Sequence, residues 1–288
     1  MKKIFLSAIS LAAALCAGGA QAAPVSAKSS VTVSNVRYTL IDLDTSDNIA
    51  PSIHFNFRDD PDPWWRQGSA VEVNASVEAD GEKRIYTFAT VANTKVLDLS
   101  RSSSIMGLVN TSATITAGGE FGIQGAASTI QGTAEIPADS AFRGSSSFLS
   151  RGSIFSGSDF TLSAHTQLVL SFDLAASVSV FANDNQVAAG EVEFNAALGY
   201  VDALGQYHPS RIERHIRLNS RWDSAQSINE TFSLSVNNTT ANDLAGNGGI
   251  GSETRGYAFA APVPEPETYA MLLAGLGLLG CVAKRRRA

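Results

Sequence analysis

Two adjacent tryptophans, Trp64 and Trp65, are the residues whose type and spacing most plainly suggest chemistry. Indole rings exposed on a loop stack on sugar rings, so the pair could bind a polysaccharide. The pair could equally fill one end of a hydrophobic core, because large aromatic side chains bury much apolar surface. The sequence leaves both a sugar-binding and a packing interpretation open for these residues.

Three carboxylates at short spacing, Asp42, Asp44 and Asp47, offer a second kind of site. Oxygen ligands suit Ca²⁺, which accepts irregular coordination. The run has neither the turn glycine nor the closing glutamate of a calcium loop, and the same residues would also form a polar turn between two strands. Calcium is the one cofactor that the sequence suggests.

The sequence shows none of the common catalytic motifs. It contains no G-x-S-x-G, S-x-x-K, H-E-x-x-H or C-x-x-C, and its four histidines are too scattered to suggest a metal site. We therefore expect a protein that is not an enzyme. A hydrolase with two carboxylates far apart in the sequence stays open, because such a pair leaves no spacing signal. The histidines are His54, His165, His208 and His215.

A stripe of basic residues interrupts an otherwise acidic body at Arg211, Arg214, Arg217 and Arg221. On a strand, Arg211 and Arg217 would share one face with His215, and Arg214 would point to the other face. This split argues against a concerted anion site and favours a solvated strand with surface ion pairs.

These residues lie among short segments in which apolar and polar side chains alternate, as they do in strands with one buried face. Glycine, asparagine, aspartate and serine clusters separate the segments. We expect an all-β body built as a two-sheet, jelly-roll-like β-sandwich. The segments with the clearest pattern are 31–40, 53–57, 71–77, 85–91, 160–181, 191–196, 212–218 and 232–236.

Residues 101–159 differ from this pattern, because 13 serines and 9 glycines replace most of the large apolar side chains. Serine and glycine are typical of turns and irregular segments, so we expect this part of the body to be rich in loops, with flat, weakly patterned edge strands as the alternative. The run Gly246–Gly251 is likewise expected to be a glycine-rich loop.

Composition excludes several classes of protein. Of 21 basic and 27 acidic residues, six and two respectively lie in the two ends, so the body holds 15 against 25 and has a net charge of −10. Nucleic acid is therefore not an expected partner, because phosphate binding needs a basic surface. Both cysteines, Cys16 and Cys281, lie outside the body, which must fold without disulfides.

The N-terminal residues predict a secretory signal peptide over residues 1–22. Lys2 and Lys3 precede a short apolar run, and Ala20 and Ala22 form the A-x-A site that signal peptidase accepts. We expect cleavage before Ala23 and export of a body spanning residues 23–261, a length that suits one large or two small domains.

Residues 262–288 predict a tail that stops in the membrane. Its prolines favour an extended approach, and the 16 residues after Glu267 would form a transmembrane helix of only about 24 Å, short of the ~30 Å hydrocarbon core. Terminal basic residues would hold the C-terminus in the cytoplasm and leave the body outside. The tail contains Val263, Pro264, Glu265 and Pro266, and ends with Lys284, Arg285, Arg286 and Arg287.

This tail resembles the PEP-CTERM sorting signal, in the Val-Pro-Glu-Pro start, the Leu- and Gly-rich helix and the arginine end. The resemblance implies a Gram-negative bacterium that makes exopolysaccharide, and processing by a membrane protease called exosortase. It also implies transient anchoring in the inner membrane, followed by display at the cell surface or release into the extracellular matrix.

We therefore expect an exported surface or matrix protein, structural or adhesive in a biofilm or exopolysaccharide. The first alternative is a carbohydrate-binding module that uses Trp64 and Trp65. The second is a secreted hydrolase with carboxylates dispersed in the sequence.

Sorting through the tail makes a direct prediction for the native host. The body should be released from the membrane, ending near Pro264, only when a functional exosortase is present. Mass spectrometry of secreted and membrane fractions with and without the protease checks this. A chain that still ends at Ala288 in the membranes of both strains would contradict it.

Overall fold

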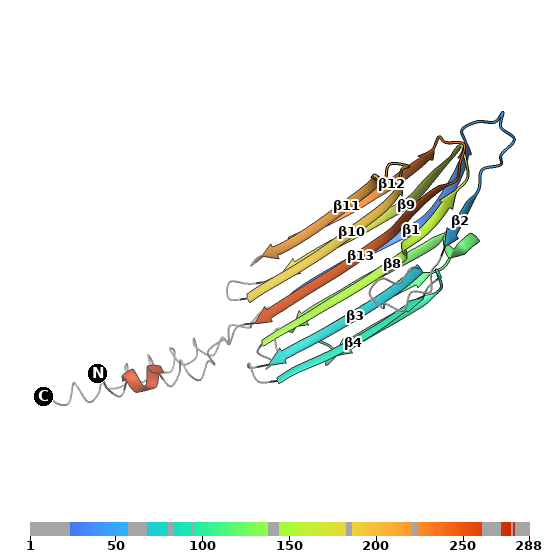
Figure 1. Ribbon diagram of the computed structural model, residues 1–288. Helices are drawn as coiled ribbons and strands as arrows, with labels where there is room; N and C mark the ends of the chain where they lie inside the picture. The colour runs from blue at the N-terminus through green and yellow to red at the C-terminus, as the bar shows by residue number, and fades with distance from the viewer. Residues whose placement is uncertain are drawn as a thin grey trace, which may run out of the picture. The chain divides into compact units, whose positions relative to one another are not determined.

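Alternation of buried and exposed side chains builds the body from antiparallel strands (Figure 1). The computed structural model describes residues 24–56, 68–79, 83–93, 95–137, 144–182, 186–220, 224–260, 272–277 and 279. Residues Pro24–Ala260 form one compact unit. The expected all-β, two-sheet sandwich is confirmed.

The first sheet, sheet A, has six strands, all paired antiparallel. In spatial order they are β12 (Ser224–Asn238), β9 (Thr166–Phe181), β1 (Val25–Asp42), β7 (Ala126–Ile136), β6 (Val109–Thr116) and β5 (Leu99–Ile105). A short 3₁₀ helix, η1 (Glu120–Gly122), joins β6 to β7.

The second sheet, sheet B, is antiparallel as well and lies against sheet A. In spatial order its strands are β11 (Tyr207–Ser220), β10 (Gln186–Val201), β13 (Leu244–Ala260), β8 (Gly144–Leu162), β3 (Gly68–Ala79) and β4 (Lys83–Asn93). The short β2 (Ile53–Asn56) pairs with the end of β8.

The core between the sheets changes in character along the strands. One part is filled by large side chains, among which Phe155, Phe160, Phe172 and Phe194 are fully buried. In the other part, alanines such as Ala134 and Ala258 make up about half of the buried apolar residues. Apolar burial is the main stabilising term for such a body.

One aromatic ring fits the small-residue part of the core because two glycines make room for it. Phe148 on β8 lies between Gly132 on β7 and Gly256 on β13, and a Cβ atom at either glycine would overlap its ring. The ring therefore needs a glycine on both sheets. Close packing leaves no space for an added methyl group.

The expectation that residues 101–159 are rich in loops is wrong. They contain β5, β6, β7 and most of β8, and β7 and β8 are inner strands of their sheets. Small side chains face inward here and allow close approach of the sheets. Buried hydroxyl groups join the two sheets, since Thr111 hydrogen-bonds to Ser150, and Ser29 Oγ donates to the Arg255 carbonyl oxygen over 2.9 Å.

The expectation of a glycine-rich loop at Gly246–Gly251 is also wrong, because this run lies inside β13. The glycines are required by neighbouring side chains. A Cβ at Gly246 would meet the Phe160 ring, and one at Gly248 would meet Leu198. Glycine is an unfavourable strand residue, and its usual reason in a strand is such a close approach.

The open edges of the two sheets are tied together by side chains. On one side, Arg214 of β11 donates two hydrogen bonds, of 2.8 and 3.1 Å, to Glu230 of β12, and its guanidinium lies 4.7 Å from the centre of the Phe232 ring. On the other side, the hydroxyl groups of Thr87 on β4 and Ser103 on β5 are hydrogen-bonded. Side chains thus connect edges that have no backbone pairing.

The tail is described only at residues 272–277 and 279, which are helical. Among the described residues, no helix is both long and apolar enough to cross a membrane. The signal peptide and most of the expected transmembrane helix lie outside the described residues.

The glycine slot predicts a sharp loss of stability on small changes. Gly132→Ala or Gly256→Ala should destabilise the protein by about 1–3 kcal/mol, because the new methyl group overlaps the Phe148 ring. Chemical denaturation with matched slopes measures the change. Gly251→Ala, on the outward face of β13, is the control and should be near neutral, and equal losses in all three variants would contradict the packing argument.

Candidate functional site

The outer face of sheet B carries a row of charged side chains that crosses its inner strands. The strand register sets Glu193 of β10 opposite Glu253 of β13, Glu253 opposite Arg151 of β8, and Arg151 opposite Glu72 of β3. Cα atoms of opposed residues lie about 4.5–5.5 Å apart. Four charged groups, three of them acidic, thus lie side by side.

Arg151 is the basic residue within this row. Its guanidinium hydrogen-bonds to Glu253 and lies 3.8 Å from a Glu72 carboxylate oxygen. Burial alone would lower the pKa of Arg151, but the hydrogen bond to Glu253 and the charges of Glu253, Glu72 and Glu193 raise it above its ordinary value. Three carboxylates therefore share the charge of one half-buried guanidinium.

The next row along the strands adds Arg255 and Glu191. Arg255 forms an ion pair with Glu253, but the Glu253 oxygen that it contacts accepts no hydrogen bond. A guanidinium nitrogen of Arg255 also lies 3.9 Å from a carboxylate oxygen of Glu191. His215 of β11 places Nε2 2.7 Å from a Glu191 oxygen. Ligand atoms of Glu191, Glu193 and His215 lie within 4.8 Å of one another.

The faces expected for the basic stripe are confirmed. Arg211, His215 and Arg217 are exposed on the outer face of sheet B. Arg214 points to the other side, where it contacts Glu230 and Phe232 of β12. The stripe is therefore divided between two roles and forms no single anion site.

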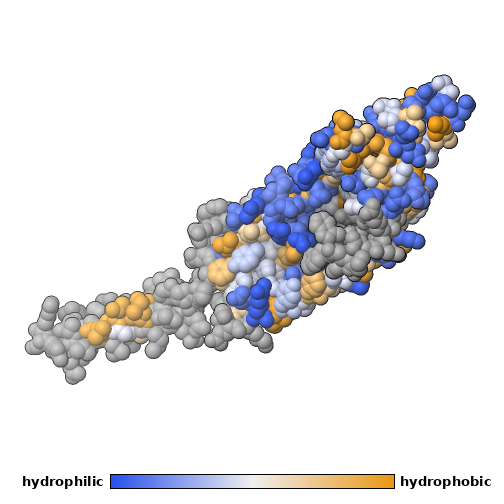
Figure 2. Space-filling model, in the orientation of Figure 1, coloured by the Kyte–Doolittle hydropathy of each residue, from blue (hydrophilic) through white to orange (hydrophobic). Residues whose placement is uncertain are grey.

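A groove of about 690 Å³ runs over this face. The charged row and Asn195 line it together with Phe88 of β4. Phe88 and the neighbouring Tyr86 are each about half exposed, at 50% and 51%. Figure 2 shows hydrophilic and hydrophobic side chains intermixed on the face of sheet B turned toward the viewer. The groove combines charges, an amide and an open aromatic ring.

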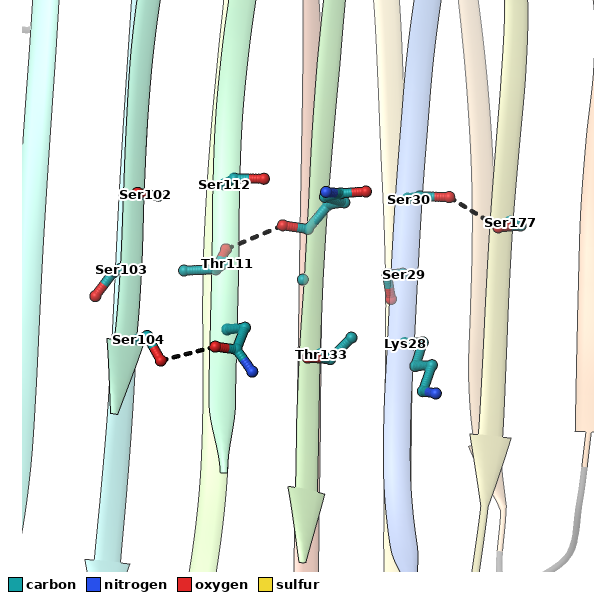
Figure 3. Close-up of a pocket in the computed structure, with 13 residues that line it drawn as sticks. Lys28, Ser29, Ser30, Ser102, Ser103, Ser104, Thr111, Ser112, Thr133 and Ser177 are labelled. Carbon is teal, nitrogen blue, oxygen red and sulfur yellow. Dashed lines mark hydrogen bonds between the residues drawn. The ribbon is translucent and has the colours of Figure 1, made fainter. Parts of the chain in front are cut away.

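The outer face of sheet A is different, since hydroxyl and amide groups cover it. A shallower hollow of about 590 Å³ crosses β9, β1, β7, β6 and β5. Figure 3 shows its side chains, with Ser30 and Ser177 hydrogen-bonded at 2.9 Å and Ser104 donating to Asn110 over 2.7 Å. Many of these groups satisfy one another. Among the lining residues, Lys28 alone carries a charge.

Part of the expected calcium run comes together at the loop end of the sandwich. Asp44 and Asp47 lie close to His165, which is in the turn between β8 and β9. One potential ligand atom of each residue is within 4.8 Å of those of the other two. Asp42 is not a member of this group, and its carboxylate accepts a hydrogen bond of 2.9 Å from the Asp44 amide. Ser46 donates two hydrogen bonds to Asp44 and lowers the pKa of that carboxyl. Two carboxylates and an imidazole could hold a divalent cation, and calcium stays a prediction.

Sequence reasoning missed His165 and the charged row for the same reason. Both sites are made by strand pairing between segments far apart in the chain. For His165, the pairing of β1 with β9 sets Asp42 opposite Thr166. This pairing puts the turn after β1 and the turn before β9 at the same end of the sandwich. For the charged row, the alternation in residues 191–196 predicted that Glu191 and Glu193 share one face of a strand. The residues opposite them on neighbouring strands could not be predicted, because they depend on the strand order.

Several expected site residues lie outside the described residues. They are Trp64 and Trp65, the cleavage residues Ala20, Ala22 and Ala23, the motif residues Val263, Pro264, Glu265 and Pro266, and the basic residues Lys284, Arg285, Arg286 and Arg287. Their roles stay predictions here.

Comparison with known proteins identifies the tail. Residues 262–287 match the family model of the PEP-CTERM protein-sorting motif, so the chain carries this motif, which implies export, processing by exosortase and sorting to the cell surface. No curated protein sequence matches the chain. Among solved structures, one from work on carbohydrate-binding modules of the β-sandwich superfamily is 11% identical and covers 74% of this chain and 97% of its own, with a TM-score of 0.11. A likeness this low carries no argument.

The charged row predicts how stability depends on pH. Arg151→Ala should destabilise the protein by about 1 kcal/mol at pH 7, because three carboxylates then repel one another. The loss should shrink as the pH falls through about 4, where carboxyl groups take up protons. Denaturation at both pH values measures this. Adding Glu193→Gln should restore part of the loss at pH 7, and strictly additive effects would contradict the shared-charge interpretation.

Proposed function

We propose that this protein is an adhesive protein of the cell surface or extracellular matrix that binds polysaccharide, without catalysis, in the groove of sheet B. The observation that carries the proposal is the groove itself, in which carboxylates, an amide and a guanidinium face the same space as an exposed phenyl ring. Such a mixture fits a ligand with many hydroxyl groups and apolar ring faces.

The sorting motif supports the setting for this role. A chain carrying the PEP-CTERM motif is exported, and its tail would hold it in the inner membrane of a Gram-negative bacterium until exosortase acts. Release would then place the sandwich among exopolysaccharides of a biofilm. A polymer of this kind would be the most abundant ligand around it.

The dimensions of the groove suit an extended polymer. Phe88 on β4 and Glu193 on β10 are separated by four strand spacings, or about 19 Å. A single sugar is too short to touch both. An oligosaccharide that crosses the strands could stack one ring on Phe88 and present hydroxyl groups to Asn195 and the carboxylates. Affinity should therefore rise with ligand length.

Hydrolysis is the second candidate, since Glu193 and Glu253 lie side by side in the groove. A hydrolase needs one carboxyl group that donates a proton and one that stays ionised. Both oxygens of Glu253 are engaged by guanidinium groups, one from Arg151 and one from Arg255. This fixes Glu253 in the ionised role, so Glu193, which is exposed to solvent, would have to donate the proton. Binding is the first candidate because it requires no such division of roles, and release of reducing ends from exopolysaccharide would favour hydrolysis instead.

Binding through the groove predicts the effect of one surface substitution. Phe88→Ala should weaken retention on exopolysaccharide from the host roughly tenfold, because it removes the exposed ring that a sugar would cover. Affinity electrophoresis with the purified protein measures the change. Leu204→Ala removes an apolar side chain that is 85% exposed in the turn after β10 and should have no effect.

Two outcomes would contradict the proposal. The first is a wild-type protein that is not retained by exopolysaccharide. The second is equal retention of wild type and Phe88→Ala. Replacement of Trp64 and Trp65 by Ala in parallel tests whether the tryptophan pair contributes to the same binding.

A further inference from the structure

Glu193 is the carboxylate of the groove whose charge has no matched partner. It is exposed, and no described basic residue lies within ion-pair distance of it. Its direct neighbour on the adjacent strand, β13, is another carboxylate, Glu253. Like charges placed opposite one another on adjacent strands destabilise a sheet.

Of the cations nearby, Arg151, Arg255 and His215 are engaged with other carboxylates, whereas Arg217, opposite Glu191 in the register, is in no described ion pair. Arg151 bonds to Glu253 and lies close to Glu72, and Arg255 is shared between Glu253 and Glu191. His215, opposite Glu193 in the register, directs Nε2 to Glu191 over 2.7 Å. The lining of the groove itself holds Glu72, Glu193 and Glu253 against Arg151 alone. An excess of negative charge therefore remains at the Glu193 end.

A neutral side chain at position 193 would remove the repulsion from Glu253 and would lose only the longer-range attraction between Glu193 and Arg151. The arrangement thus costs some stability and leaves a surface that a positive charge would neutralise. Because the site is half open to solvent, an approaching cation gains a modest, salt-dependent attraction. Charge complementarity of this kind contributes selectivity more than raw affinity.

We propose that Glu193, with Glu253 beside it, binds the ammonium group of an amino-sugar unit, so that the groove prefers polysaccharides with free amino groups to neutral ones. This inference rests on the proposed polysaccharide binding and names the class of polymer. The opposite class, polymers of uronic acids, would meet carboxylates in the groove and a body of net charge −10, and should bind weakest.

A pair of ligands that differ only at the amino groups, which are free and charged in one and acetylated and neutral in the other, tests the inference. We would measure binding of a β-1,4-linked glucosamine hexamer and of its fully N-acetylated counterpart to the purified protein by calorimetry. At about pH 5.5 the amine is protonated and glutamate, with a usual pKa near 4.3, is ionised. EDTA in all samples removes metal ions that Glu191, Glu193 and His215 could share.

The wild-type protein should bind the free-amine hexamer about tenfold tighter than the acetylated one at low salt, and the preference should shrink as salt is added. Glu193→Gln should reduce the preference to threefold or less. Glu78→Gln, which removes a charge from the same face outside the groove lining, should leave it unchanged. Thermal melts confirm that the variants fold, and Glu193→Gln should melt no lower than wild type.

Each alternative result has a definite meaning. Equal binding of the two hexamers, or a preference that survives Glu193→Gln, would overturn the amino-sugar assignment and leave polysaccharide binding intact. A preference lost equally in Glu78→Gln would show that only net charge matters and would overturn the site. Binding of neither hexamer overturns the assignment, and retention on exopolysaccharide then decides separately whether the protein binds sugars.

Discussion

The register between long antiparallel strands is the constraint on which the rest of this molecule depends. β10 and β13 pair without a shift from Gln186 opposite Ala260 to Tyr200 opposite Gly246. Because side chains alternate between faces, a slip of one residue would turn Phe194 outward and Glu193 into the core. The same register brings Glu193, Glu253 and Arg151 into one row. Core and candidate site are therefore set by one set of backbone hydrogen bonds.

Small inward residues make this long sandwich possible. Where the two sheets approach closely, glycine, alanine and serine replace larger side chains, and Phe148 occupies the space left between two glycines. Hydroxyl groups in this region form inter-sheet bonds, as Thr111 and Ser150 do. The hydroxyl groups of Ser128, Ser146 and Thr254 are buried without a described partner. Burying such a group unpaired costs stability, and the structure gives no compensating contact for these three.

Sequence reasoning reached the fold class because alternation is a local property. Segments such as 71–77 and 191–196 could be assigned from their own residues, and both lie in strands. The same reasoning failed for 101–159 and for Gly246–Gly251, where small residues are explained by rings on other strands. Phe148 is far in the sequence from Gly256, and Phe160 is far in the sequence from Gly246. Propensity alone could not find that reason.

The candidate site was even less accessible from the sequence. A row across β10, β13, β8 and β3 requires the strand order, which no local pattern encodes. The Asp44, Asp47 and His165 group shows an intermediate case. Its carboxylates were recognised from spacing, and its imidazole depended on the pairing of β1 with β9. The sorting tail was recognised because all of its determinants are contiguous.

The side-chain ties at the open edges have a consequence for self-association of the protein. Unpaired strand edges recruit strands from neighbouring molecules and start fibrous aggregates. Here a strand from another molecule that approached β11 or β12 would meet the ion pair between Arg214 and Glu230, which already joins these two strands. Self-association by sheet extension is therefore opposed at that edge. Contacts between copies of this chain would then involve the broad outer faces of the sheets more readily than this edge.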